Sequence, residues 1–335
     1  MQALRTYGRR TLVVTLYLII GSLMLALLPL WLPVLWLLDR RHRTSYWRCV
    51  LFFGVFIWAG LYYLSKVLVF FWLKGGPFRD GGHAYLTRLW GAQRGWGQTL
   101  YRGARTIYRL KMTVDGAERA FADPGPLLLL SRHVSFGDTI LPFELFKSRL
   151  PFQPRYVMKR ELLWDPCIDI VGCRLPNAFV RRNSRDPARE VAEVQRLMEG
   201  VGPHDVVIIY PEGTRFTPRK RQEIIDRLRE KGDTEGAARA EAYRHVLPPR
   251  PGGAIGLMEK QRTDVLFMAH IGLECIRTWR NMVDGSFVGT HLRVAFWRIS
   301  QASLPTGREA LTAWLYERWS EVDDWVARQA TEAPP

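Results

Sequence analysis

LLLLSRHVSFGD, residues 127–138, joins four consecutive leucines to a polar bend that carries a histidine and an aspartate. A short apolar run bounded by turn-forming residues predicts a buried strand, and Pro124-Gly125-Pro126 stand immediately before this one. His133 would then lie at the carboxyl end of a buried strand, where open α/β sheets bind their ligands.

The spacing of His133 and Asp138 requires a bend between them. On a straight helix two side chains five residues apart diverge, so they meet only if the chain turns at Phe136-Gly137. Asp138 can then accept from one ring nitrogen and leave the other free to take a proton. Because no Gly-x-Ser-x-Gly elbow occurs, the pair indicates a base that activates a substrate hydroxyl. The alternative is a histidine that only ends a strand.

A second apolar strand ends in a polar motif at residues 206–215, VVIIYPEGTR. Gly213 permits a close backbone approach, and Arg215 offers a planar fork for phosphate or carboxylate. With His133-x4-Asp138 about seventy residues earlier, this motif resembles the glycerolipid acyltransferases, the 1-acylglycerol-3-phosphate acyltransferases and their relatives. The resemblance extends over about residues 85–300.

The resemblance implies acyl transfer from acyl-CoA or acyl-carrier protein to the free hydroxyl of a lysophospholipid. The expected acceptor is 1-acylglycerol-3-phosphate, with another lysophospholipid or an aminolipid as alternatives. His133 would be the general base and Asp138 would orient it, without a cofactor or a metal. The expected substrate-binding residues are Arg182, Glu212, Gly213, Thr214, Arg215 and Arg250. Of these, Arg182 and Arg215 would bind the acceptor phosphate.

Arg182 enters this set because Phe179-Val180-Arg181-Arg182 matches a further motif of the family. From the residues alone, these arginines are equally consistent with a solvated strand end. Arg250 belongs to a Leu-Pro-Pro-Arg turn. The charged insert at residues 216–245 has a helix-break-helix pattern, with the break at Gly232-Asp233. This turn and the insert resemble the branch with the eukaryotic-type 1-acylglycerol-3-phosphate and lysocardiolipin acyltransferases.

Two positions depart from the family pattern. Arg132 stands where the family commonly has asparagine before the histidine. Ala269-His270 replaces a proline that the family often has at the end of a later strand, so the motif that helps to shape the acyl site is altered.

The chain is strongly basic, with a formal net charge of +16 over 335 residues. Such an excess is typical of proteins that bind nucleic acid, an anionic membrane or an anionic substrate, and 13 tryptophans favour the membrane interface. We expect no nucleic-acid partner, although a basic membrane-tethered scaffold is the non-enzymatic alternative. The spacing of the four cysteines fits no metal site, and we expect reduced thiols.

Residues 11–38 and 49–73 are apolar runs long enough to span a bilayer. Basic clusters precede, separate and follow these two runs. Two full spans would place one cluster on the side of the membrane opposite to the other two, against the positive-inside rule, whereas a hairpin that enters one leaflet and returns would keep all three on one side. Residues 84–110 have the composition of a basic amphipathic helix on lipid headgroups or of a helix packed on the domain. Gly91, Gly95 and Gly97 are expected to weaken its continuity.

These patterns predict an α/β fold, a mixed sheet flanked by helices and preceded by an N-terminal membrane-embedded helical hairpin. The expected domains are a membrane hairpin at residues 1–80, an acyltransferase domain at 81–300, and a C-terminal amphipathic helix and tail at 301–335. The protein is expected at a membrane, with its catalytic domain on the cytoplasmic face.

Overall fold

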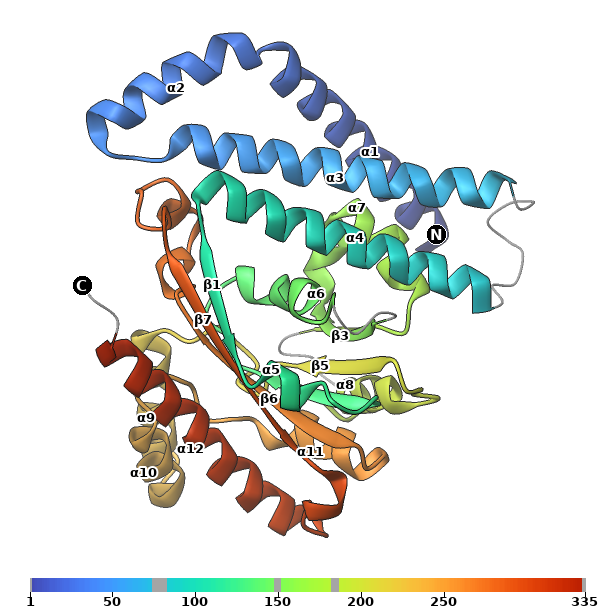
Figure 1. Ribbon diagram of the computed structural model, residues 1–335. Helices are drawn as coiled ribbons and strands as arrows, with labels where there is room; N and C mark the ends of the chain where they lie inside the picture. Colours follow the sequence, from blue (N-terminus) through green and yellow to red (C-terminus); the bar gives the residue numbers. More distant parts are fainter. Residues whose placement is uncertain (1, 74–82, 148–151, 182–186, 333–335) are drawn as a thin grey trace. The chain divides into compact units, whose positions relative to one another are not determined.

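The computed structural model describes residues 2–73, 83–147, 152–181 and 187–332 (Figure 1). The chain divides into two compact units. The first unit comprises Met1–Lys111, Thr139–Asn183 and Thr278–Thr290, and the second comprises Met112–Asp138, Ser184–Arg277 and His291–Pro335. Both units combine segments that are distant in sequence, and the boundaries expected at residues 80 and 300 stay predictions.

The second unit is built on a mixed sheet, as predicted. Its strands lie in the order β1-β7-β6-β2-β5. Strand β2 is parallel to both of its neighbours, whereas β6 is antiparallel to β7. The bounds of these strands are β1 (Lys111–Asp115), β2 (Leu127–Ser131), β5 (Asp205–Ile209), β6 (Asp264–Ile271) and β7 (His291–Ile299).

The predicted leucine strand β2 is confirmed and is an interior strand of this sheet. All four leucines are 1% exposed or less, because parallel strands are covered on both faces and therefore read as continuous apolar runs. Leu127 pairs with Val206 of β5 and with Asp264 of β6. Because β2 and β5 run parallel in this register, the motifs that follow them emerge at the same edge of the sheet.

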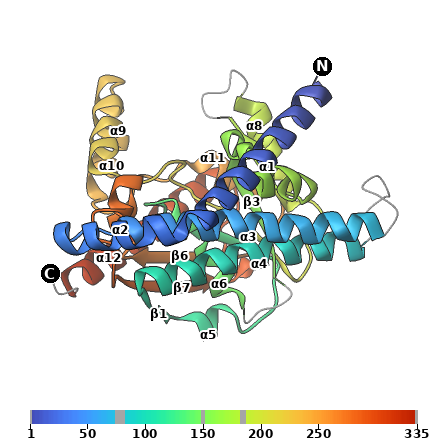
Figure 2. The same ribbon diagram turned by 90° about the horizontal axis from the view of Figure 1, so that it is seen from above.

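Helices of the second unit cover this sheet and extend from it. The predicted helix-break-helix at residues 216–245 is confirmed, and Figure 2 shows its two helices, α9 and α10, side by side. Gly232 has φ +73°, and Asp233 caps the second helix by accepting from the N–H of Gly236 at 2.8 Å. The helices are α5 (Ala117–Ala120), α8 (Pro187–Gln195), α9 (Pro218–Glu230), α10 (Thr234–Ala242), α11 (Pro251–Lys260) and α12 (Arg308–Glu332).

In the first unit, the first apolar run is divided between two helices. The break falls at Leu27, two residues before Pro29, while Pro33 lies inside the second helix. The second apolar run forms the single helix α3. The principal elements are α1 (Gln2–Ala26), α2 (Leu28–His42), α3 (Tyr46–Leu73), α4 (His83–Tyr108), α6 (Leu141–Leu145), β3 (Gln153–Lys159), α7 (Pro166–Ile170) and β4 (Ala178–Val180).

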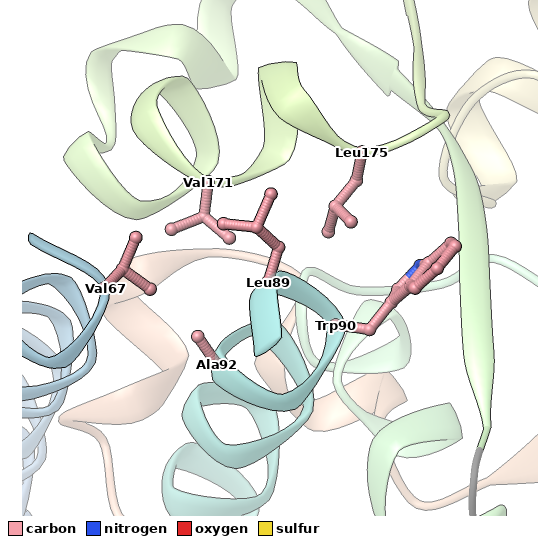
Figure 3. Packing of buried hydrophobic residues seen from close by; sticks show 6 residues of the cluster. All are labelled: Val67, Leu89, Trp90, Ala92, Val171 and Leu175. Atoms are coloured by element: carbon pink, nitrogen blue, oxygen red, sulfur yellow. The ribbon is translucent and has the colours of Figure 1, made fainter. Parts of the chain in front are cut away.

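Helix α4 is continuous through the glycines that were expected to weaken it. Two of these glycines are contact points instead, because a β-carbon on Gly95 or Gly97 would collide with the ring of Tyr63 or Phe143, respectively. A β-carbon on Gly103 would lie 2.9 Å from Val55. The helix therefore approaches α3 and α6 closely. Figure 3 shows the apolar cluster that joins α3 and α4 to the α7 region: Val67, Leu89, Trp90, Ala92, Val171 and Leu175.

Helices α1 and α2 (residues 2–42), here called the arch, bend away from α3 and return to it (Figure 1). At one foot, Arg9 and Arg10 each pair with Asp169, at 2.8 and 3.0 Å. At the other foot, Ser45 Oγ donates to the carbonyl of Met282 at 2.7 Å. Both feet of the arch are thus bonded to the first unit.

Two segments, Leu4–Ala26 and Tyr46–Phe70, are long and apolar enough to cross a membrane. The bend of the arch is also apolar and open to its surroundings. Four of its leucines are between 47% and 66% exposed: Leu23, Leu25, Leu27 and Leu30.

Candidate active site

The two sequence motifs meet through the main chain of His133. The His133 N–H donates to Oε1 of Glu212 at 2.7 Å, and the His133 carbonyl accepts from the N–H of Phe216 at 2.7 Å. The motif after β5 therefore holds the backbone of the histidine after β2 on both sides. The ends of β2 and β5 therefore lie close together within the second unit.

The His133–Asp138 pair forms as the spacing predicts. Nδ1 of His133 lies 2.9 Å from Oδ2 of Asp138, and the Asp138 side chain is fully buried. The same carboxylate accepts from the N–H of Val134 at 2.6 Å and from the N–H and the hydroxyl of Ser135 at 3.0 and 2.7 Å. The chain turns through the 3₁₀ segment Gly137–Thr139, which brings the carboxylate back to the histidine.

Asp138 is ionised at neutral pH and fixes the tautomer of the histidine. Burial alone would raise the pKa of Asp138, but the imidazoles of His270 and His133 and the Ser135 N–H outweigh it, and the pKa falls to about 2. An ionised carboxylate only accepts, so Nδ1 of His133 carries the proton. In the neutral imidazole, Nε2 then has the free lone pair, and the side chain is 14% exposed.

Tyr210 provides one wall of the site. Its ring centroid lies 4.5 Å from that of His133, with the two ring planes tilted by 36°. The contact restricts rotation of the imidazole.

The buried Glu212 side chain links two backbone segments by hydrogen bonds. Besides the His133 N–H, it accepts from the N–H of Leu247 through Oε2 at 2.9 Å, and the residue is only 1% exposed. Burial raises the pKa of Glu212 to about 8, although the Leu247 and His133 N–H groups act to lower it. Its contacts therefore put Glu212 beneath the site, joined to the backbone of the base.

Gly213 is exposed, and the Arg250 side chain lies against its backbone. Its φ of +65° suits glycine, and a β-carbon there would lie 3.1 Å from Cδ of Arg250. The Arg250 N–H donates to the carbonyl of Pro211 at 2.8 Å, which fixes the Leu-Pro-Pro-Arg turn beside the motif. Two of the predicted substrate-binding positions, Gly213 and Arg250, are thus brought together.

Thr214 and Arg215 are held by neighbouring basic residues. Lys220 Nζ donates to the Thr214 hydroxyl at 2.9 Å and to the Arg215 carbonyl at 3.0 Å. Arg215 Nη1 donates to the carbonyl of Arg277 at 3.3 Å, and the Arg277 guanidinium lies over the Phe216 ring. Positive charge therefore surrounds the end of this motif. Arg182 lies outside the described residues.

Sequence reasoning noted Arg132 and His270 as departures from a pattern but assigned them no role. Both are buried behind the His133–Asp138 pair, at 1% and 0% exposure. Arg132 pairs with Glu274, and its Nη1 and Nη2 donate to the carbonyls of His270 and His245 at 2.6 and 2.9 Å. Burial would raise the pKa of Glu274, but the Arg132 guanidinium outweighs it and the pKa is lowered.

The terminal helix α12 supplies a second contribution that the sequence did not reveal. Asp323 accepts from the N–H groups of Arg244, His245 and Val246 at 3.0, 2.6 and 2.9 Å. Trp319 Nε1 donates to the carbonyl of Leu247 at 3.1 Å. Apolar residues recur at helical spacing in α12, which predicts that this helix packs against the core. The only signal in the sequence for its contacts with the 244–247 segment was an acidic residue, Asp323, within the apolar stripe.

Among the residues that the structure describes, no cluster of three or more histidine, cysteine or acidic side chains could hold a metal ion.

Residues 111–265 match the family model described as acyltransferase. The fold is similar to that of the crystal structure of the 1-acyl-sn-glycerophosphate (LPA) acyltransferase PlsC from Thermotoga maritima. That match covers 87% of this chain and 98% of the other, with a TM-score of 0.57 and 16% sequence identity. At such low identity, the structural likeness concerns the fold.

Proposed function

Because the chain belongs to the glycerolipid acyltransferase family, we propose that it transfers an acyl chain from a thioester donor to a lysophospholipid hydroxyl. The observation that carries this proposal is the His133–Asp138 pair, which leaves Nε2 partly exposed beside a group of basic residues. Ser135 is buried and donates its hydroxyl to Asp138. The attacking hydroxyl is therefore assigned to the acceptor lipid.

The reaction follows from the protonation state of the pair. Nε2 of His133 takes the proton from the acceptor hydroxyl as its oxygen attacks the thioester carbonyl. Asp138 stabilises the imidazolium that forms. The tetrahedral intermediate then collapses, the carbon–sulfur bond breaks, and the imidazolium returns the proton to the leaving thiolate. The products are an ester and a free thiol, and the donor is acyl-CoA or acyl-carrier protein.

We assign 1-acylglycerol-3-phosphate as the acceptor and phosphatidic acid as the product. A phosphomonoester carries nearly two negative charges and three acceptor oxygens at neutral pH. Arg215 and Arg250 belong to the motif end and the turn that meet at Gly213, and guanidinium forks suit such a group. Arg182 is retained as a further phosphate ligand on the strength of its sequence motif alone.

We further propose that the arch enters one leaflet of a membrane and returns, with the catalytic residues on the cytoplasmic face. The support is that both feet of the arch are bonded to the first unit while its apolar bend is exposed. Helix α3 is also bonded to the remainder of this unit, since Cys167 Sγ donates to the Gly60 carbonyl at 3.2 Å. A helix attached along its length to polar elements lies along a bilayer surface rather than across it.

The test is acyl transfer by the purified protein, with labelled acyl-CoA and a panel of lysolipids that includes 1-acylglycerol-3-phosphate. His133→Ala should lower kcat by roughly 10²–10⁴-fold, the range for loss of a general base. His204→Ala, at an exposed histidine of the same unit, is the matched control and should retain activity. No turnover by the wild-type protein with any acceptor would reject the enzymatic assignment and favour a scaffold.

A further inference from the structure

We propose that His270 is a positioning residue that holds the catalytic histidine in its working orientation through the Arg132 carbonyl. The inference rests on the proposed function and adds a named residue to its machinery. His270 lies near the end of β6, next to β2, and 137 positions after His133 in the chain.

The first observation is a reciprocal contact between Arg132 and His270. Nε2 of His270 lies 3.0 Å from the Arg132 carbonyl, while Nη1 of Arg132 donates to the His270 carbonyl at 2.6 Å. Each side chain thus binds the main chain of the other, and we call this pair the Arg132–His270 clamp. A carbonyl oxygen only accepts, so Nε2 of His270 carries the proton.

The clamp acts on the peptide group that leads into His133. The Arg132 N–H donates to the carbonyl of Met268 at 3.1 Å, and the His133 N–H and carbonyl are bonded to Glu212 and Phe216. The remaining polar group, the Arg132 carbonyl, accepts from the Ser131 hydroxyl at 3.1 Å and from His270 at 3.0 Å. Ser131 precedes Arg132 in the chain, so His270 is the partner that ties this carbonyl to the neighbouring strand β6.

The second observation concerns the surroundings of His270. Its side chain is fully buried, and Nδ1 has no hydrogen-bond partner among the described residues. An unpaired buried polar atom is costly, so an apolar residue would suit this position better if only packing mattered. The hydrogen bond from Nε2 to the Arg132 carbonyl accounts for the presence of a histidine at this position.

Burial keeps His270 neutral. Burial and the Arg132 guanidinium lower the pKa of His270, against the opposing effects of Asp138 and Glu274. Nε2 of His270 donates to the Arg132 carbonyl and also lies 4.0 Å from Oδ2 of Asp138, the carboxylate that holds His133. A neutral His270 therefore supports the pair without competing for the proton that His133 must carry.

Three substitutions separate this role from simple packing. In His270→Gln, the side-chain amide nitrogen reaches close to the position of Nε2 and can donate to the Arg132 carbonyl. In His270→Asn the amide is one methylene too short, and His270→Phe has no donor. Phe267→Leu is the control, because Phe267 is buried in the same strand but packs against Trp314 and Trp319 of α12.

We expect His270→Gln to keep kcat within about threefold of wild type, and His270→Asn and His270→Phe to lower it roughly ten- to hundredfold. The KM values of donor and acceptor should change by less than about twofold, because neither substrate contacts the clamp. Phe267→Leu should lower the unfolding temperature and leave kcat unchanged. A wild-type kcat in His270→Phe, or equal losses in the Gln and Phe variants, would overturn the inference.

A measurement without substrate keeps the inference separate from the proposed function. In protein labelled with ¹⁵N-histidine, the Nδ1–H of His133 bonded to Asp138 should give a downfield proton resonance, identified by its absence in His133→Ala. It should persist in His270→Gln and be lost to solvent exchange in His270→Phe. An unchanged resonance in His270→Phe would refute the positioning role, whereas inactivity of the wild-type protein would refute only the acyltransferase assignment.

Discussion

Replacing Asp138 by asparagine changes one atom of a carboxylate on which four described donors converge. These are Nδ1–H of His133, the Val134 N–H, and the N–H and hydroxyl of Ser135. An amide offers a single accepting oxygen, and its nitrogen would face one of these donors. The residue is fully buried, so water cannot replace a lost partner.

The size of the effect follows from the pKa of Asp138. A fall from the ordinary value of 3.8 to about 2 corresponds to roughly 2 kcal/mol of stability from the ionised carboxylate. Because the folded-state pKa is the lower one, this contribution is complete above about pH 5 and is lost as the pH falls toward about 2. Asp138→Asn should therefore lower the free energy of unfolding by about 2 kcal/mol at pH 7 and by much less near pH 2.

The same substitution should lower kcat roughly 10²–10⁴-fold, because the amide nitrogen favours the wrong tautomer of His133. The assays are denaturant unfolding in detergent at several pH values and acyl transfer under saturating substrates. Equal destabilisation at pH 7 and pH 2 would show that the charge of Asp138 is not what stabilises the bend. Near-normal turnover would show that the histidine does not depend on Asp138 for its tautomer.

Three further results are expected. Since the folded-state pKa of Glu212 is raised to about 8, stability should fall as the pH rises from about 4.5 to 8, and Glu212→Gln should flatten this decline in thermal unfolding. Arg215→Ala should raise the KM for 1-acylglycerol-3-phosphate roughly tenfold or more and leave the acyl-CoA KM unchanged, with Arg215→Lys intermediate. Leu27→Glu combined with Leu30→Glu, at the exposed bend of the arch, should reduce flotation with anionic liposomes, and undiminished binding would argue against membrane insertion.

The sequence was most informative where the governing interactions are local. The strand before His133, the bend to Asp138 and the break at Gly232-Asp233 are set by apolar runs and turn residues, and the structure confirms each of them. The meeting of the two motifs was also predictable, because parallel strands bring their carboxyl ends to one edge.

The remainder depends on pairings between distant residues. Arg132 and His270 are 138 positions apart, and no periodic pattern indicates that each binds the main chain of the other. Glu212 was expected in the acceptor pocket by resemblance, whereas its contacts are to backbone N–H groups beneath the surface. The glycines of α4 were taken as helix-weakening residues because their partner, Tyr63, belongs to another helix.

The attachment of α12 to the 244–247 segment has a consequence for the newly made protein. This segment supplies the Leu247 N–H to Glu212 and the His245 carbonyl to Arg132, and Asp323 and Trp319 hold it in place. Helix α12 is translated after every other described element, while the apolar arch is translated before them. Chains are made at about 5–20 residues per second, so an interval of many seconds separates the two. In a ribosome-bound chain, the arch, which is the proposed membrane anchor, would therefore be available while the candidate active site still lacked its last support.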